Sequence, residues 1–181
     1  MRTLALLFCL TAAASAAVDT LIPVSVGTYD QWFCTEPSKV TAVVPPDDAT
    51  VIQGTAAESS QSYFLSTPDI PVGSTIDWVA VSVRLHGAAS SGQSFLRLGT
   101  SEVHSPSHFL YYGEGYVTFV DTIALELTLG DLDNLQVGVY AVDGGAYAEN
   151  CMTLFVMVGY TAGEPPPAPS DDNGFWGWLG D

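Results

Sequence analysis

Apolar residues recur at every second position in several stretches of the chain, and this alternation limits the fold more than any other feature of the sequence. In TIDWVAVSVRL (75–85), Val79, Val81 and Val83 fall on one side, whereas Trp78 and Arg84 fall on the other. The segments TIALELTL (122–129), LQVGVYAV (135–142) and CMTLFVMVGY (151–160) alternate in the same way. Successive side chains of a β-strand point to opposite faces, so each stretch is typical of a strand that buries one face.

Turn-forming residues separate these stretches. The intervening segments include TPDIPVGST (67–75), HGAASSGQ (86–93) and GDLDN (130–134), and no segment combines a helical period with helix caps. Short strands at nearly regular spacing with such turns favour an all-β fold, an antiparallel β-sandwich or jelly roll. We expect one domain over residues 17–161.

The stretch VDTLIPVSVGTY (18–29) also alternates, but it contains Pro23. Proline has no N–H to donate, so the stretch is expected to form an edge strand or a strand that pairs on one side only. It either begins the domain's own sheet or is donated to a neighbouring subunit.

The first 16 residues predict export. MRTLALLFCLTAAASA has one basic residue, a short apolar run, and small residues at Ala14 and Ala16, which is the pattern of a signal peptide cleaved before Ala17. The remaining 165 residues carry three basic residues against 20 acids, a formal charge of −17. Such a charge disfavours nucleic acid and anionic membrane surfaces as partners, and the sequence predicts neither binding to nucleic acid nor membrane insertion. The expected location is secreted, either extracellular or on the cell surface.

Composition changes abruptly near Thr161. Residues 162–174 are rich in proline and acids and are predicted to be a linker, and residues 175–181 form a short aromatic C-terminal peptide. We predict a docking role for the large side chains of that peptide on the same protein or another surface protein, the alternative being a disordered end; these are Phe175, Trp176, Trp178 and Leu179.

Two cysteines, Cys34 and Cys151, remain after export. In an oxidising compartment a pair in one domain favours a disulfide, and two buried thiols are the alternative.

Aromatic residues supply the candidate ligand site. Trp78, Tyr111, Tyr112 and Tyr116 are predicted to form a platform for a sugar, although each type also packs on ordinary sheets.

Candidate metal ligands occur in DLDN, where Asp131, Asp133 and Asn134 offer oxygen atoms to calcium; turn capping explains the same residues. No other cofactor is expected.

No motif predicts catalysis. The sequence lacks a GxSxG elbow, and HSPSH (104–108) has Pro106 between its histidines, which disfavours a helical metal site and favours a surface loop. We therefore expect a protein that is not an enzyme.

The chain resembles β-sandwich modules of phage structural proteins and bacterial secreted proteins. The segments that carry the resemblance are an early Trp32, the PPDDAT turn (45–50), the strand at 76–83, DLDNLQVGV (131–139) and the closing strand at 156–160. The resemblance implies a structural or binding module. We predict a secreted, non-catalytic structural or adhesive subunit of an extracellular assembly; a carbohydrate-binding module and a secreted hydrolase are the alternatives.

Overall fold

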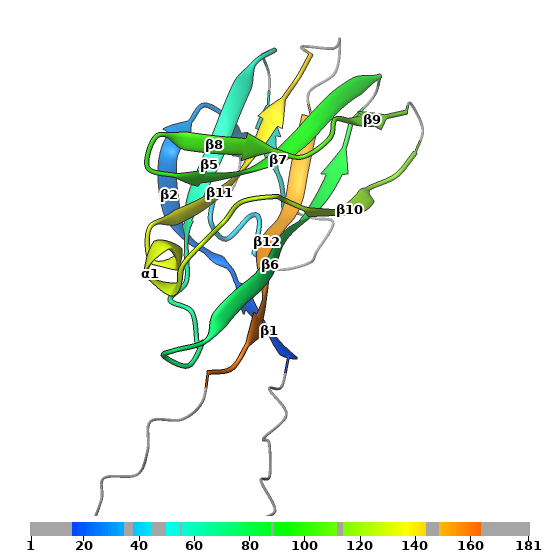
Figure 1. Cartoon of the computed structure of the whole chain (residues 1–181). Helices are drawn as coiled ribbons and strands as arrows, with labels where there is room; N and C mark the ends of the chain where they lie inside the picture. Colours follow the sequence, from blue (N-terminus) through cyan, green and yellow to red (C-terminus); the bar gives the residue numbers. More distant parts are fainter. Residues whose placement is uncertain are drawn as a thin grey trace, which may run out of the picture.

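The computed structural model describes residues 16–34, 38–44, 50–54, 56–87, 89–111, 114–143 and 149–163. Two antiparallel sheets pack face to face in this part of the chain, with one short helix, which confirms the predicted all-β sandwich (Figure 1). Nearly all of the predicted signal peptide and the aromatic C-terminal peptide lie outside the described residues. No described helix is long and apolar enough to cross a bilayer.

Sheet A has the order β10-β6-β12-β4-β3, and β1 also pairs with β12. Its strands are β1 (Ala16–Leu21), β3 (Phe33–Cys34), β4 (Ile52–Gly54), β6 (Thr75–His86), β10 (Val117–Thr122) and β12 (Glu149–Thr161).

Sheet B has the order β2-β5-β11-β7-β8, and β9 also pairs with β7. Its strands are β2 (Pro23–Asp30), β5 (Ser59–Leu65), β7 (Ser90–Leu98), β8 (Ser101–His104), β9 (His108–Leu110) and β11 (Leu135–Ala141), and the helix α1 (Leu129–Leu132) precedes β11.

The core lies between the inner faces of the two sheets. Alternate apolar residues of β6, β12 and β11 are buried there, as the period of two predicts; they include Val79, Val81, Val83, Leu154, Val156, Leu135 and Val137. Their removal from water is the main driving force for closing the sandwich.

TIALELTL behaves differently from the prediction. Residues 123–128 form no strand, and Leu129 begins α1. Ile123 is buried, and Leu125 and Leu127 pack on the core while their neighbours are exposed. The segment leads from β10 of sheet A to α1, which precedes β11 of sheet B. The Ile123 N–H donates to the Val79 carbonyl of β6 at 3.0 Å, and after it the alternation reflects core contact without a strand ladder.

The first strand pair confirms the prediction of one-sided pairing. The chain leaves sheet A after Leu21 and enters sheet B at Pro23, and β1 pairs with β12 whereas β2 pairs with β5. Both segments belong to the domain's own sheets, which is the simpler of the two predicted arrangements.

The predicted disulfide between Cys34 and Cys151 is wrong for this structure, which contains none between them. Cys34 of β3 and Cys151 of β12 both lie opposite Ile52, on either side of β4. Neighbouring strands are about 4.8 Å apart, so Cα atoms two strands apart exceed the separation of about 7 Å that a disulfide spans. The Cys34 Sγ lies 3.5 Å from the Val51 carbonyl oxygen.

We therefore expect both thiols to react with iodoacetamide when the chain is unfolded without reductant. Mass spectrometry of the alkylated protein should give the same mass with and without prior reduction, and the reduced sample serves as the control. Two fewer alkylated cysteines in the unreduced sample would show that the sheet rearranges to form the bond.

Candidate functional site: a groove on the outer face of sheet B

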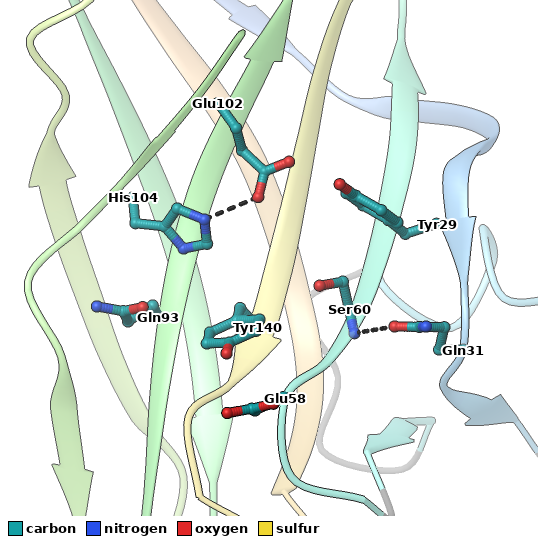
Figure 2. A pocket seen from close by; sticks show the side chains of 8 residues that line it. All are labelled: Tyr29, Gln31, Glu58, Ser60, Gln93, Glu102, His104 and Tyr140. Carbon is teal, nitrogen blue, oxygen red and sulfur yellow. Dashed lines mark hydrogen bonds and ion pairs between the residues drawn. The ribbon is translucent and has the colours of Figure 1, made fainter. Parts of the chain in front are cut away.

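An open groove of about 480 Å³ lies on the outer face of sheet B (Figure 2). Its eight lining residues come from five strands and the turns beside them: Tyr29, Gln31, Glu58, Ser60, Gln93, Glu102, His104 and Tyr140. Figure 2 shows Glu102 at one end of the groove and Glu58 at the other, with Tyr140 between them.

Strand register explains why these residues meet. Tyr140 of β11 lies opposite Ser60 of β5 on one side and Gln93 of β7 on the other. The intervening positions of β11, which include Val139 and Ala141, point to the core. The same alternation that buries the valines therefore places a row of polar and aromatic side chains on the outer face.

Phe95 lies beneath two lining residues of the groove, Tyr29 and His104, and we call it the floor of the groove. It lies opposite Gly138 and His104, and it is fully buried although it belongs to the outer face. The Tyr29 ring covers it edge-on at a centroid distance of 6.0 Å, and the His104 ring lies at 5.3 Å. A Cβ atom on Gly138 would lie 2.1 Å from Phe95 Cζ, so the absence of a side chain there makes room for the ring.

A charged cluster holds one wall of the groove. Glu102 contacts Arg97 at 3.2 Å through Oε2 and His104 Nε2 at 2.7 Å through Oε1. Arg97 also donates to the Tyr29 hydroxyl at 3.0 Å and lies 5.0 Å from the centre of that ring. These contacts fix the orientation of Tyr29 and His104.

Gln136 ties the edge strand β2 to the rest of the wall. Its Oε1 accepts hydrogen bonds from the Thr28 backbone N–H at 2.7 Å and from the Ser62 hydroxyl at 3.0 Å. The backbone N–H of Tyr29 donates to the Ser62 hydroxyl at 3.0 Å. Side chains thus replace part of the strand ladder, whose register shifts in this part of β2.

The other wall presents polar atoms without partners. The Glu58 carboxylate and the hydroxyl groups of Tyr140 and Ser60 make no hydrogen bond to any residue that the structure describes. Gln31 uses its Oε1 to accept from the Ser60 backbone N–H at 2.6 Å, and its amide N–H₂ has no hydrogen-bond partner among the described residues. Glu58 also has φ of 56°, a left-handed conformation that costs energy for a residue with a side chain.

The predicted sugar platform does not coincide with this groove. Trp78 lies on the outer face of sheet A, over Gly159. Tyr116 packs on His86 with the rings tilted and a centroid distance of 4.7 Å, and the exposed Tyr111 packs edge-on against Phe109 at 4.8 Å. Tyr112 lies outside the described residues.

Asp131 of the predicted metal group caps the helix α1. Its Oδ2 accepts from the Thr128 backbone N–H at 2.8 Å and from the Thr128 hydroxyl at 2.6 Å. The hydrogen bonds from Thr128 lower the pKa of the Asp131 carboxyl. Asp133 is the C-cap and Asn134 donates its N–H to the Asp131 carbonyl, as turn capping predicts. The described residues include no cluster of three or more His, Cys, Asp or Glu side chains placed to hold a metal ion.

The HSPSH histidines lie in two strands. His104 ends β8, and His108 begins β9. His108 contacts Asp121 of β10 at 2.7 Å and stacks on Phe119 at 3.9 Å, so it joins an edge of sheet B to an edge of sheet A. Only His104 belongs to the groove.

No family model matches the sequence, and neither does any curated protein. Solved structures similar in architecture include a carbohydrate-binding module, CBM6cm-2, of the Cellvibrio mixtus lichenase 5A in complex with cellotriose. It has 14% sequence identity and a TM-score of 0.48, over 76% of this chain and 94% of that chain. A mutant of the module CBM29-2 complexed with mannohexaose has 10% identity and a TM-score of 0.45, over 79% of this chain and 92% of that chain.

Proposed function

We propose that the protein is a non-catalytic module that binds a glycan in the groove on sheet B. The observation that carries the proposal is that one groove contains both two tyrosine rings and polar groups that have no hydrogen-bond partner among the described residues. Sugars offer apolar C–H faces that pack on aromatic rings, and hydroxyl groups that donate to carboxylates and accept from amides. Tyr29 and Tyr140 supply the rings, and Glu58, Ser60 and Gln31 supply the hydrogen-bonding groups.

The shape and charge of the groove support a neutral glycan over other ligands. It is open to solvent, and its lining is mainly polar, unlike the apolar core of a protein interface. The two carboxylates and the acidic chain as a whole oppose a polyanion.

The groove also favours binding over hydrolysis. Both oxygens of Glu102 are engaged, by Arg97 and by His104. Glu58 is then the one lining carboxylate whose oxygens have no partner among the described residues. Glycoside hydrolysis generally uses a pair of carboxyl groups that flank the scissile bond, one as acid and one as base or nucleophile. A secreted, adhesive role agrees with such a module, because the glycans of cell surfaces and walls would be its targets.

We expect replacement of Tyr140 by alanine to weaken glycan binding about tenfold or more, since a stacked ring and a hydroxyl group are both lost. An array of neutral, anionic and amino-sugar oligosaccharides that includes cellotriose and mannohexaose identifies the ligand. Titration calorimetry on the best binder then compares Y140A, E58Q and the unmodified chain.

The matched control is Y111A, which removes an exposed tyrosine outside the groove. Thermal unfolding checks that each variant is folded. An array without a binder would exclude the proposed function, and equal affinities for Y140A and Y111A would exclude this groove as the site.

A further inference from the structure

A second surface, on the outer face of sheet A, is free of charge and mostly apolar. We call it the sheet A strip, and it consists of three rows across neighbouring strands: Val120–Ser82–Phe155, Thr122–Ala80–Met157–Thr20 and Trp78–Gly159–Val18. Val18, Trp78 and Val120 are 57%, 40% and 59% exposed. In a chain with 20 acids, three successive rows without a charged side chain indicate a surface that is covered by something.

Trp78 lies in the row at one end of the strip, next to Gly159 and on the same row as Val18. Its indole lies flat over Gly159, where a Cβ atom would be 2.1 Å from the ring nitrogen. The ring is therefore held from below by the sheet, beside the exposed Val18, and its other face is available for contact. Ring faces of this kind are common anchors for a docked aromatic or apolar side chain.

We propose that the sheet A strip is the docking surface for the aromatic segment of the same chain, residues 175–179. That segment contains Phe175, Trp176, Trp178 and Leu179 and no charged residue. Its apolar side chains match a strip that is itself uncharged.

The described residues end close to the strip, which supports residues 175–179 as the segment that docks there. β12 ends at Thr161, two residues beyond the glycine under Trp78, and Gly163 packs against the carbonyl of Gly73 in the turn before β6. Eleven residues lie between Gly163 and Phe175. A proline-rich linker extends by about 3.1 Å per residue, so the twelve steps from Gly163 to Phe175 reach roughly 37 Å. The strip from Trp78 to Ser82 spans four residues of β6, only about 13 Å.

A segment on the same chain docks without the cost of bringing two molecules together, so weaker apolar contacts suffice for docking within one chain than between two. Docking on a second copy lacks this advantage and must overcome the repulsion between two chains that each carry a formal charge of −16. The same chain is therefore the favoured occupant.

Chymotrypsin cleavage within the aromatic segment tests the proposal, because a docked segment is cut only when it is released. We expect V120D to speed cleavage after Trp176 and Trp178 about tenfold, as a buried charge expels the segment. V72D is the matched control: it makes the same substitution at a site that is 94% exposed in a turn outside the strip. Equal rates in V120D, V72D and the unmodified chain overturn the proposal.

Oxidation of Met157 provides a second test, and this test needs no substitution in the sheet A strip. The double substitution W176S/W178S should raise the rate at which peroxide oxidises Met157 several-fold, whereas the rate at the fully buried Met152 stays unchanged. An unchanged Met157 rate counts against docking. Protection that increases with protein concentration, together with a dimer mass by light scattering, would assign the segment to a second copy and overturn docking within one chain.

Discussion

Replacing Trp32 by alanine is expected to lower the free energy of unfolding by about 3–5 kcal/mol, the largest effect of any substitution considered for this chain. Trp32 is 2% exposed and contacts Gly54, where a Cβ atom would lie 2.7 Å from the ring. Its indole N–H donates to the Ser59 carbonyl at 3.1 Å, so the alanine variant leaves both a cavity and an unsatisfied acceptor.

Urea unfolding monitored by circular dichroism measures the decrease in the free energy of unfolding, and F33A is the control. Phe33 is the next residue in the chain and is 57% exposed, so its removal should change stability by about 0.5 kcal/mol or less. Similar losses in both variants would show that Trp32 contributes no more to the core than its exposed neighbour does.

The second large effect is expected at Gly138. An added methyl group there would lie 2.1 Å from Phe95 Cζ and 2.5 Å from the backbone oxygen of Gln61, and the backbone cannot move away without disturbing β5. We expect G138A to lower the free energy of unfolding by about 1–3 kcal/mol and to displace the floor of the groove.

Thermal unfolding of G138A beside G115A provides the comparison, since no atom lies within 4 Å of the position that a Cβ on Gly115 would take. The variant G138A should melt several degrees lower than G115A. Equal melting temperatures would mean that Phe95 moves freely, and the groove floor would then be less rigid than the contacts imply.

Much of the fold follows from local sequence pattern. The alternation of Val79, Val81 and Val83 predicts which face of β6 is buried, and Pro23 predicts one-sided pairing of the first segment. The same reasoning fails at 123–128, because a period of two reports which side chains meet the core and says nothing about a partner strand.

The local sequence pattern does not show which distant strands pair with each other. The disulfide prediction failed because β4 lies between Cys34 and Cys151, which only the strand order shows. The groove was missed for the same reason: Ser60, Gln93 and Tyr140 become neighbours through register alone. Trp78, which the sequence singled out for the sugar platform, lies on the opposite sheet.

The pairing of β1 with β12 sets an order for folding. Ala16 lies opposite Thr161 and Leu21 opposite Val156, so the first strand of the domain has no partner until its last strand is available. Contacts this distant in sequence make folding slow, because the ends of a long loop must meet first. The sandwich therefore closes only after nearly the whole domain is available, wherever synthesis or transport delivers the chain from its N-terminus onward.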